Sequence, residues 1–271
     1  MATRQRGCRI KSGMTTLQMR ADQLLVERGL ATTRSQAQRL IASGVRWLDR
    51  GAWKAVAKNG DELPPGAEVQ LQDSAQTRYV SRGGLKLEGA LQASGIDAAG
   101  LRCLDVGQST GGFTDCLLQH GAAHVTGVDV GHGQLHAKLR ADPRVTVIEK
   151  LNARELSAAQ AGDGFDLATG DLSFISLTLV LPALVPLLRA GGALLMLVKP
   201  QFELQPGQIG KRGIVTDPLL YPLVERRIRD CCAALGLQVR GWYDSPVAGG
   251  DGNREFFVHA RKDQGPDHER A

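Results

Sequence analysis

Residues 102–130 read RCLDVGQSTGGFTDCLLQHGAAHVTGVDV, and this stretch predicts a strand, a glycine-rich loop, a helix and a second strand. The first strand is the short apolar run 103–106, and the loop begins at Gly107. A helix is expected over 113–119 and the second strand over 124–130. Strands that alternate with helices in this way form mostly parallel sheets. The stretch therefore predicts an α/β fold.

The loop G-Q-S-T-G-G is suited to hold a ligand on main-chain N–H groups. Gly107 allows a sharp turn where the strand ends, and Gly111 and Gly112 place no Cβ between the backbone and a close ligand. Ser109 and Thr110 complete the loop. We expect all five residues to bind a cofactor.

Asp129 lies in the second strand, twenty-four residues after Asp105. An acid at this spacing can bond the two hydroxyls of a ribose. The dinucleotide pattern G-x-G-x-x-G is absent, and Asp105 would repel a phosphate, so a nucleoside with a positive charge fits better than NAD. We therefore predict S-adenosylmethionine as the cofactor. An ordinary strand-to-helix turn of a doubly wound sheet is the alternative.

The composition narrows the class of protein. A chain of 271 residues with 42% apolar content is long enough for two domains, of which one should be much larger. The five cysteines form no C-x-x-C pair, which disfavours a disulfide framework or a zinc site and favours a reducing cytoplasm. His132 and His136 lack the glutamate of H-E-x-x-H, so no metal site is predicted. The longest apolar run, 177–188, is too short to span a membrane.

The basic excess lies at the N-terminal end, where residues 1–78 hold 13 Lys and Arg against 7 Asp and Glu. Helices are expected over 19–29 and 33–44, and short strands over 45–49, 53–56 and 68–71. Through R-A-D-Q-L-L, T-R-S-Q-A-Q-R-L-I and a G-V turn, residues 19–72 resemble the αL RNA-binding domain named after ribosomal protein S-four. The resemblance implies that arginines contact the phosphates of folded RNA. The candidates are Arg20, Arg34, Arg39, Arg46 and Arg82. A solvated helix face is the alternative.

The rest of the chain continues the alternation. Helices are expected over 81–95 and 153–161, from 176, and over 218–235; strands are expected over 145–149, 165–169, 193–198, 238–243 and 255–260. This pattern predicts a Rossmann-like, doubly wound and mostly parallel sheet. Ligands bind at the carboxyl ends of such strands. We therefore expect one crevice lined by the polar residues at the strand ends, which are Asp105, Gly107, Asp129, Asn152, Asp171 and Lys199.

Five motifs in order carry a close resemblance to a known family: V-S-R-G-G-L-K-L-E-G-A-L, D-V-G-Q-S-T-G-G-F-T-D, G-D-L-S-F-I-S-L, L-V-K-P-Q-F-E and G-N-R-E-F-F. Over residues 19–262 the chain resembles the TlyA family of ribosomal RNA 2′-O-methyltransferases, which also carry the name haemolysin. Its catalytic half is similar to the FtsJ (RrmJ) group of class I methyltransferases. The resemblance implies ribosomal RNA or a ribosomal subunit as partner and S-adenosylmethionine as cofactor, with Asn152 and Asp171 in the cofactor site.

The same resemblance implies a catalytic tetrad of Lys86, Asp171, Lys199 and Glu255. Lys199 would steer or accept the proton of a ribose 2′-hydroxyl and Asp171 would orient it, while Lys86 and Glu255 would shape the field and hold the ribose. Gln108 stands where a small residue is usual, and we expect this departure to matter little. The loop 210–218, G-K-R-G-I-V-T-D-P, also departs from the usual form.

The expected organisation is a tail (1–18), the RNA-binding domain (19–72), a linker (73–80), the methyltransferase domain (81–262) and a second tail (263–271). Two other classes of function stay open. A membrane-active haemolysin would need an amphipathic or apolar segment, which the sequence lacks. A non-catalytic RNA-binding protein would have little need for Gly107, Asp129, Asp171 and Lys199.

Overall fold

The computed structural model describes residues 18–31, 33–71, 78–210, 213–249 and 252–264. The chain divides into two compact units between Thr77 and Arg78, and each unit is described by itself. Residues 1–17, 72–77 and 265–271, with most of the predicted tails and linker, lie outside the described residues. So do residues 211–212 of the loop 210–218.

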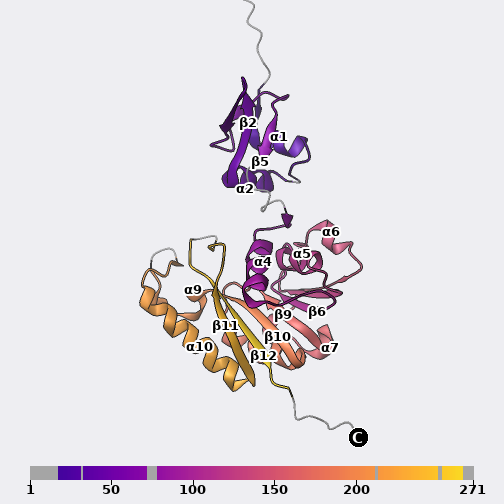
Figure 1. Ribbon diagram of the computed structural model, residues 1–271, viewed down its shortest axis with the longest axis vertical. Helices are drawn as coiled ribbons and strands as arrows, with labels where there is room; N and C mark the ends of the chain where they lie inside the picture. Colours follow the sequence, from indigo (N-terminus) through magenta and orange to yellow (C-terminus); the bar gives the residue numbers. More distant parts are fainter. Residues whose placement is uncertain (1–17, 32, 72–77, 211–212, 250–251, 265–271) are drawn as a thin grey trace, which may run out of the picture. The chain divides into compact units, whose positions relative to one another are not determined.

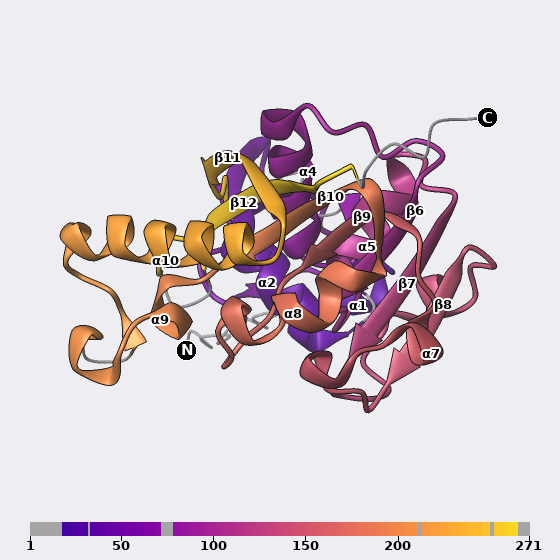
Figure 2. The same cartoon turned by 90° about the horizontal axis from the view of Figure 1, so that it is seen from below.

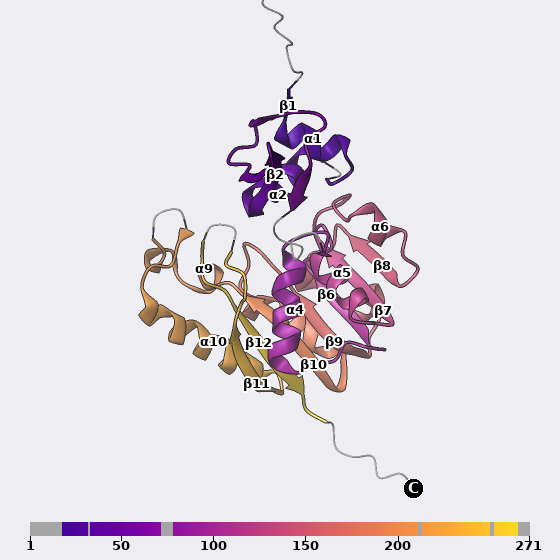
Figure 3. The same cartoon turned by 45° about the horizontal axis from the view of Figure 1, so that its top comes forward.

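Over its described residues, the N-terminal unit combines two helices with two small antiparallel sheets (Figure 3). Its elements are β1 (Met19–Arg20), α1 (Ala21–Glu27), α2 (Arg34–Gly44), β2 (Val45–Asp49), β3 (Ala52–Ala55), β4 (Glu62–Leu63) and β5 (Val69–Leu71). One sheet pairs β1 with β4, and the other has the order β3-β2-β5. The prediction that the first helix starts at residue 19 was wrong, because Met19 and Arg20 pair as a strand with Leu63 and Glu62.

The C-terminal unit is built on one seven-stranded sheet (Figure 1). Its strands are β6 (Arg102–Val106), β7 (His124–Asp129), β8 (Val145–Glu149), β9 (Phe165–Gly170), β10 (Leu188–Val198), β11 (Leu237–Asp244) and β12 (Phe256–Lys262). The order is β11-β12-β10-β9-β6-β7-β8. Strand β12 is antiparallel to both its neighbours, and the other pairs are parallel. The predicted mostly parallel α/β sheet is confirmed.

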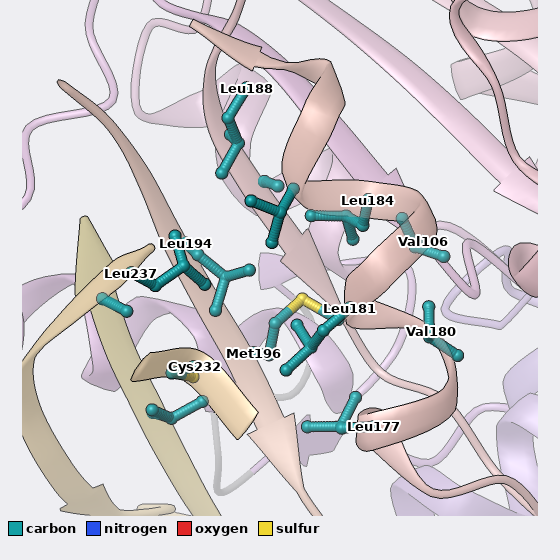
Figure 4. Packing of buried hydrophobic residues seen from close by; sticks show 14 of the residues in the cluster. Val106, Leu177, Val180, Leu181, Leu184, Leu188, Leu194, Met196, Cys232 and Leu237 are labelled. Atoms are coloured by element: carbon teal, nitrogen blue, oxygen red, sulfur yellow. The ribbon is translucent and has the colours of Figure 1, made fainter. Parts of the chain in front are cut away.

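Helices cover both faces of this sheet (Figure 2). Helices α4 (Gly83–Ser94) and α5 (Gly112–Gln119) pack on one face, and α8 (Leu181–Leu184) and α10 (Tyr221–Ala234) pack on the other. Alternate residues of β10 enter the two cores, as the period of a strand requires. Figure 4 shows one core, where Met196 of β10 packs near Leu181 of α8 and Cys232 of α10. No helix of the described residues is long and apolar enough to cross a membrane.

Two predicted helices are broken into short pieces. Over 153–161 the chain forms a 3-10 turn, η1 (Ala153–Glu155), and the short helix α7 (Ala158–Ala161), because Ser157 between them is extended. After residue 176 it forms η2 (Leu177–Leu179), α8 and η3 (Val185–Leu187), where Pro182 and Pro186 lack the amide hydrogens of a longer helix. Two short helices, α6 (Ala137–Arg140) and α9 (Pro200–Glu203), were not predicted.

The strand order positions a ligand site. From β6 the chain moves outward through β7 to β8, and it then returns to the other side of β6 at β9. The carboxyl ends of β6 and β9 therefore flank the point where the strand order reverses. In open α/β sheets, ligands bind in the crevice at this point.

Candidate cofactor and catalytic site

The loop between β6 and α5 depends on glycine at three positions. Gly107 has a φ of 82°, and a Cβ there would lie 2.7 Å from the main-chain oxygen of Asp171. A Cβ on Gly111 would lie 2.3 Å from Leu139 Cδ1, and one on Gly112 would lie 2.2 Å from Ser81 Oγ. From the sequence, we expected a ligand in the space beside Gly111 and Gly112. In the structure, α6 and the residues before α4 fill that space.

Asp129 ties the end of β7 to this loop. Its Oδ2 accepts a hydrogen bond from the Ser109 amide at 2.7 Å, and its Oδ1 accepts one from the Gly131 amide at 2.7 Å. Ser109 has a φ of 47°, which is uncommon for a residue with a side chain. A carboxylate has about four acceptor positions, so Asp129 retains capacity for the hydroxyls of a ligand.

Two adjoining cavities lie at the carboxyl ends of the strands. The larger cavity, of about 460 Å³, is lined by Gly107, Ser109, Asp129, Gln134, Asn152, Asp171 and Ser173 and by apolar residues that include Val130, Leu151, Phe174 and Ile175. The smaller cavity, of about 210 Å³, shares Gly107, Ser109, Asp171 and Ser173 and adds Ser81, Gly83, Gln108, Thr110, Gly112, Phe113 and Lys199. Small-molecule sites have volumes of this order. Most of the predicted cofactor residues therefore lie together, whereas Asp105 and Gly111 line neither cavity.

Asp105 lies beneath the glycine loop, where it is 1% exposed. Burial raises the pKa of its carboxyl to about 7, and the carboxylates of Asp171 and Asp129 raise it too, while Thr114 lowers it. Its Oδ2 accepts a hydrogen bond from Thr114 Oγ1 at 2.7 Å. Its Oδ1 has no hydrogen-bond partner within the described ranges. Asp105 can therefore influence a ligand through its charge below the loop rather than by forming the cavity wall.

Lys199 follows β10 and reaches the wall of the smaller cavity. Its Nζ lies 2.5 Å from Asp171 Oδ1, which makes an ion pair, and it donates a hydrogen bond to Ser173 Oγ at 2.8 Å. The lysine side chain is 11% exposed. Asp171 and Ser173, which follow β9, thus hold the Lys199 ammonium group at the wall of the smaller cavity.

The other two predicted catalytic residues form a second ion pair. Lys86 of α4 donates from Nζ to Glu255 Oε2 at 2.5 Å, and both side chains are buried. Neither residue lines either of these two cavities. The antiparallel register pairs Val198 with Phe256, so its continuation sets Lys199 opposite Glu255. The structure therefore brings the four residues to one end of the sheet as two ion pairs.

Phe174 was not singled out from the sequence. It has a φ of 64°, its side chain is 91% exposed, and it lines the larger cavity. Its ring centroid lies 5.3 Å from that of Phe202 in α9. A left-handed backbone at a residue with a bulky side chain is costly, and such strain clusters at functional sites. The sequence carries no signal for this conformation. Ser173, the hydrogen-bond partner of Lys199, was also missed.

In the N-terminal unit, one buried carboxylate joins two predicted RNA-binding arginines. Asp22 is fully buried and accepts hydrogen bonds from Arg20 Nε at 3.0 Å and Nη2 at 2.9 Å. Arg34 Nη2 lies 3.4 Å from the same carboxylate. Hydrogen bonding to Arg20 holds the pKa of Asp22 well below its usual range. Asp22 therefore anchors both guanidinium groups.

The remaining candidates do not share this anchor. Arg46 is exposed on β2, and Arg82 is exposed immediately before α4 in the C-terminal unit. The side chain of Arg39 lies outside the described part of the chain.

Asn152 is a further predicted cofactor residue. Its Oδ1 accepts a hydrogen bond from the Arg154 amide at 3.1 Å, so its position at the larger cavity is fixed by the start of η1.

The larger cavity fits a nucleoside that carries a positive charge. Asp129 can accept hydrogen bonds from a ribose, and the apolar side chains of Val130, Leu151 and Ile175 offer a surface to a base. Carboxylates lie on one side, with Asp171 at the wall and Asp105 below the loop. Negative side chains without a phosphate-binding lysine in this wall favour a cation over an anion.

Comparisons with known proteins identify the family. The FtsJ-like methyltransferase family matches residues 79–262. The 16S/23S rRNA (cytidine-2′-O)-methyltransferase TlyA of Mycobacterium tuberculosis is 45% identical over 242 residues, which cover 89% of each chain. A solved structure from Streptococcus thermophilus, which carries the name hemolysin, is 40% identical with a TM-score of 0.71 and covers 94% of this chain and 92% of its own.

A more distant solved structure shares the fold alone. It comes from Listeria monocytogenes and is named as an S-adenosylmethionine dependent methyltransferase. It is 15% identical with a TM-score of 0.51, and the match covers 67% of this chain and 98% of that one.

Proposed function

Because the chain belongs to the FtsJ-like methyltransferase family, we propose that it transfers a methyl group from S-adenosylmethionine to a ribose 2′-hydroxyl of ribosomal RNA. The observation that carries the proposal is the ion pair between Lys199 and Asp171 at the wall of the smaller cavity. This cavity adjoins the one that fits a nucleoside. The name of the M. tuberculosis relative supports the choice of acceptor.

The cofactor supplies an electrophilic methyl group on a sulfonium. Asp129 would accept hydrogen bonds from its ribose and Asn152 would lie beside the same ligand, while Val130 and Leu151 would offer an apolar surface to its base. The loop that begins at Gly107 would hold its remaining part, with the hydroxyl groups of Ser109 and Thr110 as hydrogen-bond partners. Asp171 lines both cavities and thereby connects cofactor binding with the acceptor side.

Lys199 acts on the acceptor. A ribose hydroxyl is a weak acid and reacts poorly unless a nearby group orients it and takes up or steers its proton. Asp171 and Ser173 hold the Lys199 ammonium in one place, so the side chain loses little further freedom when the substrate arrives. Lys86 and Glu255 hold the neighbouring ends of α4 and β12 and fix the electric field around the acceptor.

The RNA is captured by basic and aromatic side chains. Arg20, Arg34 and Arg46 of the N-terminal unit contact phosphates, which supply affinity and position rather than base specificity. Phe174 at the rim of the larger cavity offers an exposed ring on which a base can stack. Stacking there would help to hold a nucleotide outside its helix for methylation.

The test is transfer of a labelled methyl group. The purified protein is incubated with S-adenosylmethionine labelled in its methyl group and with 16S or 23S rRNA, either free or in subunits. The RNA is then digested to nucleosides. We expect the label in 2′-O-methylnucleosides. Label in methylated bases, or transfer to none of these RNAs by a protein that binds the cofactor, would overturn the proposed acceptor.

A further inference from the structure

Gln108, expected from the sequence to matter little, is built into the glycine loop. Its side chain is 4% exposed and lies against Gly127 of β7, where a Cβ would be only 1.9 Å from Gln108 Nε2. Its main-chain amide donates to Val128 O at 3.1 Å. Gly127 therefore leaves the space that a long side chain at position 108 requires.

This side chain begins a relay of two hydrogen bonds. Gln108 Nε2 donates to Thr114 Oγ1 at 2.8 Å, and Thr114 Oγ1 donates to Asp105 Oδ2 at 2.7 Å. An amide nitrogen can only donate, so it occupies an acceptor position of the Thr114 hydroxyl and leaves the single hydroxyl proton for Asp105. A carboxyl that receives a hydrogen bond is favoured in its ionised form.

The surroundings of Asp105 act on its pKa in the opposite direction to this hydrogen bond. Burial is the largest influence and raises the pKa of Asp105 to about 7, and Asp171 after β9 and Asp129 at the end of β7 raise it as well. The thiols Cys103 of β6 and Cys116 of α5 also lie near enough to interact with Asp105. The carboxyl thus titrates near neutrality, where one hydrogen bond changes its ionised fraction substantially.

We propose that Gln108 is a positioning residue for the cofactor, which acts through Thr114 to keep Asp105 ionised beneath the glycine loop and so favours a cationic ligand above it. This inference rests on the proposed function, because S-adenosylmethionine supplies the cation. Without the Gln108 amide, the Thr114 hydroxyl can turn and accept a proton from Asp105, which favours the neutral carboxyl.

The test is the affinity for S-adenosylmethionine, measured by calorimetry from pH 6 to pH 9. The wild-type protein should bind more tightly as Asp105 ionises. Gln108→Met keeps the volume beside Gly127 but removes the donor, so its binding curve should move to higher pH. The loss of affinity at pH 7 should be about 2- to 12-fold, the range of one hydrogen bond, and it should shrink towards pH 9. Asp105→Asn should remove this pH dependence, and Gln92→Met on the exposed side of α4 should match the wild type.

Three results separate the possible failures. A Gln108→Met curve with the wild-type midpoint would overturn the relay, and so would an equal loss of affinity at every pH, which a merely structural role predicts. No binding of S-adenosylmethionine by the wild-type protein at any pH would instead overturn the proposed function. The relay also has a readout without cofactor. The free energy of unfolding is measured against pH, and the contribution of Asp105 is obtained by subtracting the curve of the Asp105→Asn variant made in the same background. The midpoint of this contribution should lie at higher pH in Gln108→Met than in the wild type.

Discussion

Lys86 Nζ and Glu255 Oε2 lie 2.5 Å apart, although 169 residues separate them in the sequence. The lysine side chain is 8% exposed and the glutamate side chain is 3% exposed. The pair joins α4 to the beginning of β12, beside the end of β10 that carries Lys199. Removing one partner of such a pair leaves an uncompensated charge in a poorly solvated place.

We predict that Lys86→Met and Glu255→Leu each lower the free energy of unfolding by about 3–5 kcal/mol. The double variant should recover much of this loss, because an apolar pair replaces two charges. Urea denaturation of the four proteins measures the coupling between the two positions. Single variants as stable as the wild type would show that the pair carries no such energy. The double variant should remain poor at methyl transfer, which separates folding from chemistry.

This contact could not be derived from the sequence by physical reasoning. The strand–loop–helix stretch was predictable because apolar runs, glycines and spacing are local signals. The contact between Lys86 and Glu255 depends instead on the position of β12. This strand lies between β10 and β11 and runs antiparallel in an otherwise parallel sheet. The resemblance to a family proposed the tetrad, and the structure supplies the pairing.

Asp129→Ala should weaken binding of S-adenosylmethionine by about 10- to 150-fold, the equivalent of one hydrogen bond to a charged group. The substitution removes a ribose acceptor and also releases the amides of Ser109 and Gly131. Calorimetry at constant pH measures the change. Asp142→Ala, whose carboxylate contacts Arg144, is a matched surface control. Unchanged affinity in the first variant would exclude Asp129 from the site.

His259 gives a test of pH dependence. Both of its ring nitrogens are buried without a hydrogen-bond partner among the described residues, and burial lowers its pKa below the ordinary 6.5. Near pH 6.5, His259 therefore binds a proton in the unfolded chain but not in the folded chain. The free energy of unfolding is unaffected by this residue above pH 6.5, and it decreases as the pH falls from 6.5 towards the pKa of His259 in the folded chain.

The measurement compares unfolding of the wild-type protein with that of His259→Phe between pH 7.5 and pH 5.5. The wild type should lose more stability on acidification than the variant does. Asp105 has a raised pKa and acts in the opposite direction, but it is common to both proteins and cancels in the difference. Parallel stability curves for the two proteins would contradict the prediction.

Arg34→Ala and Arg46→Ala should each reduce the slope of log affinity for RNA against log salt by about 1, because each removes one phosphate contact. Both side chains are exposed. Lys54→Ala is the control, since it removes the same charge from a residue that is not among the proposed phosphate contacts and whose Nζ lies 2.6 Å from Asp49. Filter binding at several salt concentrations gives the slopes. If both arginine variants kept the wild-type slope, the N-terminal unit would not be the RNA anchor.

Which residues line the two cavities was only partly predictable. Asp129, Asn152, Asp171 and Lys199 were predicted because polar residues at the ends of apolar strands are unusual, and all four line one or both cavities. Asp105 was expected at the ligand, but α5 covers it through Thr114. Phe174 was missed because an unusual backbone angle leaves no mark in the sequence.

Single-turnover transfer by Lys199→Ala measures whether Lys199 acts on the methyl acceptor. The variant and the wild type are saturated with S-adenosylmethionine and mixed with ribosomal RNA or subunits, and formation of 2′-O-methylnucleosides is followed in time. Cofactor affinity is measured in parallel. The variant should bind the cofactor as tightly as the wild type and transfer the methyl group about 100-fold more slowly or worse, the scale of a lost proton-transfer or orienting group. Transfer by Lys199→Ala at close to the wild-type rate would contradict this role of Lys199.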